Sequence, residues 1–308
     1  HPYHHTVIGE MDDLNAASLE DVKEWFSNYY GAANAVVVVA GDINTKEAYD
    51  KVVNYFGDIP SGPPVTHPKT CVAKRTGETR LVQQDRVPQS QISMIWNVPE
   101  WGNPEAFDLD ILASVLSDGK SSRLYKRLVY DEQICSSVSA FNWENELAGL
   151  FVIQADVKPG VDNQVVEKAI NEELARFIAE GPTTEELNRA KTSYFAGFIR
   201  GMERIGGFGG KSDILAQNTV FMGDPDYYKT RLEGMKNTTV ASVQEVAIKW
   251  LMDGKFYYEV NPFPEFSVVE TDVDRSKGLP EMGAAAAVKF PDIQRSELSN
   301  GLKVILAQ

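Results

Sequence analysis

The sequence predicts a protein of the α+β class. Two strand-like segments, residues 137–143 and 149–157, follow each other directly and predict a hairpin. Residues 91–98 (QISMIWNV) alternate between apolar and polar side chains, which is typical of a strand with one buried face. Long amphipathic helical patterns come in a separate run, and the one at 161–180 ends at Gly181-Pro182. Strands and helices grouped in this way indicate a mixed fold rather than a purely helical one.

Further elements follow from the same signals. Helical patterns at 104–116 and 121–132 lie on either side of Gly119, and two more helices begin near Thr183 and Thr239. The segment KFYYEV at 255–260 follows Asp253-Gly254 and predicts a strand. The glycines of RIGGFGGKS, at 204–212, do not have the spacing of a phosphate-binding loop, so we interpret them as a hinge that breaks a long helix.

Proline- and glycine-rich stretches divide the chain. Residues 57–78 contain four prolines and three glycines, and residues 261–296 form a second stretch of this kind. We therefore expect the C-terminal part of a first unit at 1–58, a linker at 59–78, a complete second unit at 79–262, a linker at 263–296 and the opening strand of a further unit at 297–308.

The first 58 residues predict a helix, a strand and a helix. Ser18 and Asp21 have the spacing of a capping box, and NAVVVVAGD at 34–42 predicts a buried strand. A lone strand needs a sheet, so we expect its neighbours before His1. At the other end, Asn300-Gly301 predicts a tight turn before an alternating strand whose partner would follow Gln308. Both ends suggest an internal piece of a longer protein.

Composition and charge exclude several classes of protein. The chain of 308 residues is 43% hydrophobic and has a formal net charge of −14. Nucleic acids and anionic membrane surfaces require a basic patch, so this charge argues against both. The two cysteines do not have metal-ligand spacing. No apolar run reaches the roughly 18 residues that a membrane-spanning helix needs.

No catalytic constellation emerges from the residues alone. The segment HPYHH holds three of the four histidines, but His4 and His5 are adjacent and would point to opposite sides of an extended segment. The sequence contains no His-x-x-Glu-His motif and no nucleophile elbow. We interpret the histidines as an irregular surface turn.

Three segments together resemble the pitrilysin/insulinase family of zinc metallopeptidases, which includes the mitochondrial processing peptidases. Residues 1–43 (HPYHHTVIG through AVVVVAGDI) are similar to one family signature, and LSDGKSSRLYKRLVYDEQICSSVSA at 116–140 is similar to its S-R-L-Y segment. SELSNGLKVILAQ at 296–308 resembles the strand that opens each half of these proteins. The resemblance covers essentially the whole chain.

The resemblance implies units in which helices cover an antiparallel sheet, with two halves closing around a peptide substrate. It also implies a catalytic zinc held by the His-x-x-Glu-His motif and a further glutamate, all upstream of His1. We therefore expect zinc in the parent protein, and neither a catalytic residue nor a metal ligand within this chain.

The same resemblance indicates the positions at which family members contact substrate. Val129 and Ser136 stand where the family's substrate-binding half has Arg and Tyr, so this unit departs from that pair. Four residues at the start of the S-R-L-Y segment are candidates for a loop that faces the chamber: Gly119, Lys120, Ser122 and Arg123.

The expected function follows from the resemblance. The chain is predicted to be a segment of a zinc metalloendopeptidase, inactive alone, that supplies chamber wall and scaffold. The alternative is half of a non-catalytic scaffold or peptide-binding protein of the same fold. Expected partners are peptides and the remaining half of the protein or a partner subunit, with self-association of the isolated segment. Family habit and the acidic pI of about 4.8 favour a periplasmic or secreted bacterial protein.

Overall fold

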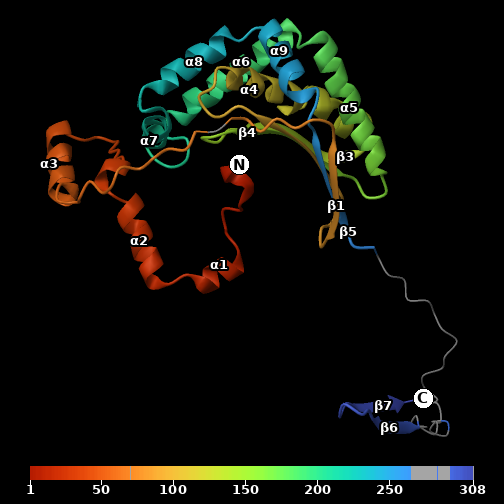
Figure 1. Cartoon of the computed structure of the whole chain (residues 1–308). Helices are drawn as coiled ribbons and strands as arrows, with labels where there is room; N and C mark the ends of the chain where they lie inside the picture. The colour runs from red at the N-terminus through yellow and green to blue at the C-terminus, as the bar shows by residue number, and fades with distance from the viewer. Residues whose placement is uncertain (70, 265–282, 284–291, 308) are drawn as a thin grey trace. The chain divides into compact units, whose positions relative to one another are not determined.

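The computed structural model describes residues 1–69, 71–264, 283 and 292–307, in two compact units. The larger unit, His1–Phe263, contains one sheet and all the helices of the described residues, and the smaller unit is Pro264–Gln308 (Figure 1). No helix in the described part of the chain is both long enough and apolar enough to cross a membrane.

The larger unit is built on a five-stranded sheet with the order β1-β5-β2-β4-β3. Only β1 and β5 pair in parallel, and the other neighbours are antiparallel, as the resemblance implied. The hairpin and both predicted single strands are confirmed. The strands are β1 (Thr79–Asp85), β2 (Gln91–Val98), β3 (Cys135–Trp143), β4 (Gly149–Val157) and β5 (Phe256–Pro262).

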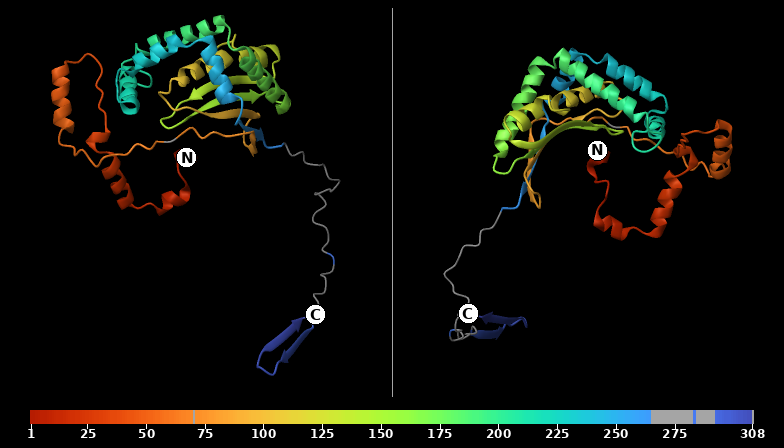
Figure 2. Two further views of the ribbon diagram at one scale, coloured as in Figure 1. Left: turned by 45° about the horizontal axis from the view of Figure 1, so that its top comes forward. Right: turned by 180° about the vertical axis from the view of Figure 1, so that it is seen from behind.

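Helices cover one face of this sheet and leave the other face open, and the views in Figures 1 and 2 agree on this arrangement. The helices of this layer are α4 (Glu105–Ser117), the π-helical η3 (Tyr125–Asp131), α5 (Asn163–Glu180), α6 (Thr184–Gly201), α7 (Lys211–Met222), α8 (Tyr227–Asn237) and α9 (Val240–Leu251). The α+β class is therefore confirmed.

The core lies between the sheet and this helix layer. Ile92, Met94 and Trp96 of β2 alternate along the strand and are buried, together with Phe151 and Ile153 of β4. They pack in one continuous cluster with apolar side chains of the helices. Each fully buried side chain of this size contributes about 1.5–3 kcal/mol to folding. The alternating pattern of the sequence is thus the inner face of the sheet.

Local signals set the helix boundaries. Thr183 and Glu186 form a capping box at the start of α6, and Thr239 caps α9. Gly181 ends α5 with φ of +70°, a conformation that favours glycine. The glycines at 206, 207, 209 and 210 separate α6 from α7, as the hinge interpretation predicted.

The first 58 residues form short helices and contain no buried residue. The capping box of Ser18 and Asp21 is present, but the prediction of a strand at 34–42 is wrong. No strand within the described ranges pairs with this segment, and a strand is defined by its ladder partner. The helices are η1 (Pro2–His4), α1 (Met11–Ala16), α2 (Leu19–Tyr29), η2 (Ala32–Asn34) and α3 (Thr45–Phe56).

The smaller unit contains a hairpin of β6 (Ile293–Glu297) and β7 (Lys303–Ala307). Gly301 has φ of +84°, which confirms the tight turn. The partner of β7 precedes it, however, where the sequence analysis expected one to follow. Residues 293–296, assigned to a linker, form most of β6, and the linker residues 265–282 and 284–291 lie outside the described residues.

Replacing Gly234 with alanine is expected to destabilise the larger unit by about 1–2 kcal/mol. A Cβ on this α8 residue would overlap the ring of Phe107 on α4. Overpacking costs about 1–3 kcal/mol, and this exceeds the helix propensity that alanine gains, about 0.5–1 kcal/mol. Urea unfolding measures the difference. Gly197→Ala in α6 is the control, since its Cβ meets no atom within 4 Å and should stabilise slightly.

Candidate functional site

The open face of the sheet carries a continuous apolar stripe. Phe256, Ile95, Val152 and Phe141 are paired across four strands, from β5 to β3. They alternate with the core residues and therefore point away from the helices. Val152 is only 6% exposed, whereas Phe141 at the edge is 39% exposed. We call these four residues the apolar stripe.

A more polar row runs beside the apolar stripe. Tyr258, Ser93, Gln154 and Ser139 are paired across the same four strands. These groups offer hydroxyl and amide hydrogen bonds next to an apolar surface. Such a mixture suits contact with a polypeptide, whose backbone is polar and whose side chains vary.

The predicted chamber-loop residues lie between α4 and η3. Gly119 and Lys120 are exposed, and Gly119 has φ of +79°. Ser122 is fully buried, and its hydroxyl donates to the Gly119 carbonyl at 2.7 Å. The loop therefore offers solvent only its first two predicted residues, while Ser122 holds the turn together. Its contact with substrate stays a prediction.

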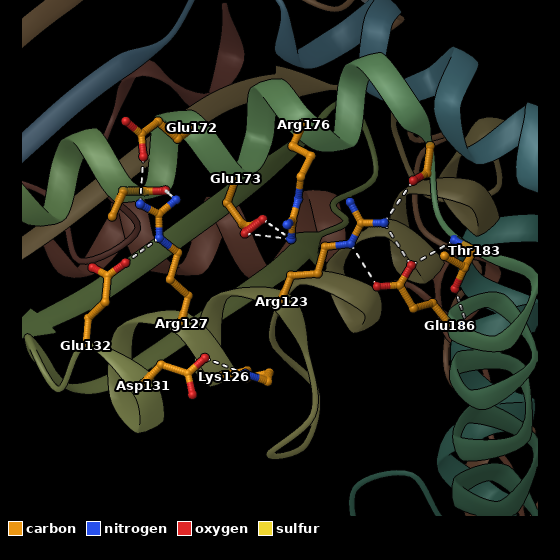
Figure 3. A network of polar contacts seen from close by, with 12 residues as sticks. Arg123, Lys126, Arg127, Asp131, Glu132, Glu172, Glu173, Arg176, Thr183 and Glu186 are labelled. Atoms are coloured by element: carbon orange, nitrogen blue, oxygen red, sulfur yellow. Dashed lines mark hydrogen bonds and ion pairs between the residues drawn. The ribbon is translucent and has the colours of Figure 1, made fainter.

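Arg123 is part of an ion network at the junction of α5 and α6 (Figure 3). Its guanidinium donates to both carboxylate oxygens of Glu186 at 2.8 Å and to the Gly181 carbonyl at 2.9 Å. It also lies 4.8 Å from the ring centroid of Phe177. The side chain is only 8% exposed. These contacts give Arg123 a structural role in joining three helices.

Arg127 extends this network along η3. It donates to Glu132 at 2.7 Å, to Glu172 at 2.6 Å and to the Ala169 carbonyl at 3.2 Å. Figure 3 shows Arg127 and Arg123 reaching toward α5 from the same side. The basic residues of the S-R-L-Y segment thus hold η3 against the helix layer.

The two positions that depart from the family pattern lie on different elements. Val129 is in η3 and packs partly against the core. Ser136 lies at a register shift in β3, where its hydroxyl accepts from the side chain of Gln89 at 2.6 Å. Its hydroxyl also donates to the Asp156 carbonyl at 3.3 Å. The guanidinium and phenol that the resemblance expects there are replaced by smaller groups.

The histidine-rich start is a short 3₁₀ turn, not the extended segment the sequence suggested. The turn brings the rings of His4 and His5 together, with centroids 3.6 Å apart, so their predicted divergence is wrong. His4 Nδ1 bonds to the His1 carbonyl at 2.8 Å. Across the described residues, no three His, Cys, Asp or Glu side chains converge to hold a metal. The described residues therefore offer no set of ligands that fits a zinc site.

Sequence reasoning missed one partly buried polar cluster. Arg231 of α8 donates to Asp110 of α4 at 2.7 Å, to Glu144 at 2.9 Å and to the Tyr194 hydroxyl at 3.0 Å. Burial raises the pKa of Asp110, Arg231 opposes this, and nearby Glu144 raises it further. The net shift is upward. The residues are far apart in the sequence, so no local pattern could have revealed the cluster.

The comparison with protein families decides the identity of the chain. Residues 16–194, more than half of the chain, match the model described as the peptidase M16 inactive domain. The chain belongs to this M16 peptidase family. The pitrilysin/insulinase resemblance is thereby confirmed.

Several M16 relatives are similar over most of this chain. Zinc protease PqqE of Helicobacter pylori is 30% identical over 241 residues, covering 76% of this chain and 53% of that protein. A probable mitochondrial-processing peptidase β subunit of Arabidopsis thaliana is 25% identical, covering 62% of this chain and 38% of that protein. The chain thus spans about half, or less, of the length of these relatives.

Solved structures agree on the fold. A protease from Helicobacter pylori superposes with a TM-score of 0.76 at 25% identity, covering 85% of this chain and 63% of that one. A peptidase M16 inactive domain from Pseudomonas fluorescens gives 0.73 at 18% identity, covering 88% of this chain and 63% of that one. The M16 architecture therefore extends beyond residues 16–194.

Proposed function

We propose that this M16 chain is the non-catalytic part of a zinc metalloendopeptidase and supplies one wall of a chamber that encloses peptides. The observation that carries the proposal is the sheet, which is covered by helices on one face and presents the apolar stripe on the other. The family description as an inactive domain and the zinc-protease relatives support it. The chain itself contains no His-x-x-Glu-His motif.

The remaining half of the enzyme would carry the zinc and complete the chamber. Relatives named as a processing-peptidase β subunit and as subunit 1 of a Caenorhabditis elegans cytochrome b-c1 complex support a partner half or subunit. The latter name also supports a second candidate, a non-catalytic scaffold. The two candidates differ in whether the full-length protein cleaves peptides. The periplasmic or secreted location stays a prediction.

The wall proposal is tested with the full-length protein and a quenched fluorescent peptide. We expect cleavage that a zinc chelator abolishes, and no cleavage by residues 1–308 alone. Ser139→Trp, which places a large side chain on the open face, should lower kcat/KM by about tenfold, since roughly 1.4 kcal/mol of substrate binding would be lost. Asn188→Trp, on the exposed surface of α6, is the control.

Three outcomes would count against this proposal. Cleavage by residues 1–308 alone would remove the non-catalytic assignment. Equal effects of the two tryptophan substitutions would remove the open face as a chamber wall. A full-length protein that cleaves no peptide, with or without zinc, would favour the scaffold.

The isolated chain is expected to self-associate through its first 58 residues. Val22, Trp25 and Phe26 lie on α2 and are each 46–51% exposed, although their spacing is that of a buried face. Sedimentation velocity of residues 1–308 should show association at micromolar concentration. The double substitution Val22→Asp and Trp25→Asp should yield monomer, whereas Glu20→Asp on the same helix should not. A wild-type monomer throughout would contradict the expectation.

A further inference from the structure

A cavity of about 600 Å³ lies beside the open sheet, among α6, α7, α8 and the turn between β3 and β4. Its volume falls within the range of small-ligand sites, about 300–1,000 Å³. Six aromatic side chains and two carboxylates line it, together with Arg231: Tyr3, Trp101, Tyr194, Phe198, Phe221, Tyr228, Glu144 and Glu146. The cavity shares no residue with the apolar stripe or the chamber-loop candidates.

The aromatic rings are held by contacts with one another. Trp101 and Phe221 meet edge to face with centroids 4.9 Å apart, and Phe198 stacks on Tyr228 at 6.1 Å. Phe221 is nonetheless 43% exposed, so part of its surface is available to a ligand. The negative face of an aromatic ring attracts cations, most strongly where water is partly excluded.

The charged side chains around the cavity carry a net negative charge, which also favours a cation. Arg231 at its base is bonded to two carboxylates, Asp110 and Glu144, which leaves the trio with an excess of one negative charge when both are ionised. Glu146 adds a second carboxylate, in contact with His67 at 3.3 Å. The nearby ammonium of Lys229, 5.7 Å from the Tyr228 ring, is bonded to the carboxylate of Asp226.

One group in the lining lacks a hydrogen-bond acceptor. The indole N–H of Trp101 is buried and has no partner within the described residues. A buried donor left unpaired costs about 1–3 kcal/mol, and a turn of the indole toward the cavity would let an oxygen atom of a ligand pair with it. The lining therefore favours a ligand with a cationic group and a nearby carbonyl oxygen.

We propose that this cavity binds the guanidinium or ammonium group of an organic cation, with the aromatic rings and Glu144 holding the charge and Trp101 donating to an adjacent carbonyl. The cation can belong to a small free molecule or to a basic side chain of a polypeptide. The proposal is independent of peptidase activity, because it concerns binding to residues 1–308 alone.

Isothermal titration of residues 1–308 with Nα-acetyl-arginine amide tests the proposal. Nα-acetyl-citrulline amide is the matched ligand, since it has nearly the same shape and no charge. We expect the arginine derivative to bind at least about tenfold more tightly, the effect of one cation in an aromatic and acidic site. Equal affinities, or no binding of the arginine derivative, would overturn the proposal.

Two substitutions locate the site. Glu144→Gln keeps the shape of the side chain and removes its charge, and Tyr228→Leu removes an aromatic face. Each substitution should weaken binding of the arginine derivative by about fivefold or more and leave binding of the citrulline derivative unchanged. Tyr130→Leu, at a side chain 70% exposed on η3, is the control. If Glu144→Gln does not fold, Tyr228→Leu alone decides, and unchanged binding by it would overturn the site.

Two further titrations distinguish the sources of the cation. Agmatine carries the guanidinium without an amide, and a pentapeptide with a central arginine carries both. Binding of the peptide at least tenfold more tightly than agmatine would assign a polypeptide ligand, and the reverse order would assign a small organic cation. Both results support the cation site, whereas failure of both ligands to bind would contradict it.

Discussion

Replacing Arg231 with methionine is expected to destabilise the larger unit by about 3–5 kcal/mol. The substitution leaves Asp110 and Glu144 close together with no cation, and a partly buried carboxylate without its partner is costly. Methionine preserves most of the side-chain volume, so the loss reports charge and hydrogen bonding. Urea unfolding followed by tryptophan fluorescence measures it. Arg200→Met, at an exposed residue of α6, is the control.

The same variant should respond to pH in a defined direction. The pKa of Asp110 is raised in the folded protein, so its carboxyl binds a proton more readily there than in the unfolded chain. A raised carboxyl pKa lowers stability as pH rises, and loss of Arg231 raises this pKa further. The destabilisation should therefore be larger at pH 8 than at pH 5, and Asp110→Asn should relieve part of it. Equal losses at both pH values would contradict this interpretation.

Replacing Arg123 with methionine should cost about 2 kcal/mol at pH 7. Burial alone would raise the pKa of Glu186, but hydrogen bonds from Arg123 and the Thr183 N–H outweigh it and lower the pKa to about 2. Each unit of pKa shift corresponds to about 1.4 kcal/mol, and much of this shift depends on Arg123. The substitution also leaves the Gly181 carbonyl without its arginine donor.

The pH dependence identifies Glu186 as the group responsible. A lowered carboxyl pKa stabilises the fold above the unfolded pKa, near 4.3, and that stability is lost as pH falls toward about 2. The difference between Arg123→Met and the parent chain should therefore shrink over this interval. Lys126→Met is the control, because its ion pair with Asp131 is 45–59% exposed and contributes less than about 1 kcal/mol. A gap that stays constant down to pH 2 would exclude Glu186.

Local sequence patterns correctly predicted most of the strands and helices between residues 79 and 262. The alternation of Ile92, Met94 and Trp96, the cap at Thr183 and the stop at Gly181 each depend on neighbours within a few residues. Such signals are contained in the sequence itself. The same holds for the turn at Gly301. These elements needed no knowledge of the rest of the fold.

Elements that depend on distant partners were missed. Strand β1 is exposed along its whole length, so it shows no apolar alternation and is ordered by its pairing with β5. The apolar segment at 35–40 carries the composition of a strand, yet it pairs with no described strand. Composition indicates which segments can join a sheet, whereas the ladder itself depends on residues far away in the chain.

The residues of the candidate site also fall into two groups, those that the sequence indicates and those that tertiary packing brings together. The resemblance led to Gly119, Lys120, Ser122 and Arg123, but it could not distinguish Arg123, which is bonded to Glu186, from the exposed Lys120. The polar cluster around Arg231 assembles residues from α4, α6, α8 and the turn between β3 and β4. Its composition depends on tertiary packing, and no spacing rule on one element could predict it.

The position of β5 has a consequence for biosynthesis. This strand is the last of its sheet to be translated, yet it lies between β1 and β2, and its Tyr257 is buried in the core. Until residue 262 has left the ribosome, β1 lacks its neighbour in the described sheet, and one edge of β2 is unpaired. Such pairing across a long separation in sequence is a slow step in folding. The unit is therefore expected to complete its sheet after synthesis, and chains that end before Phe256 should be targets for chaperones and proteases.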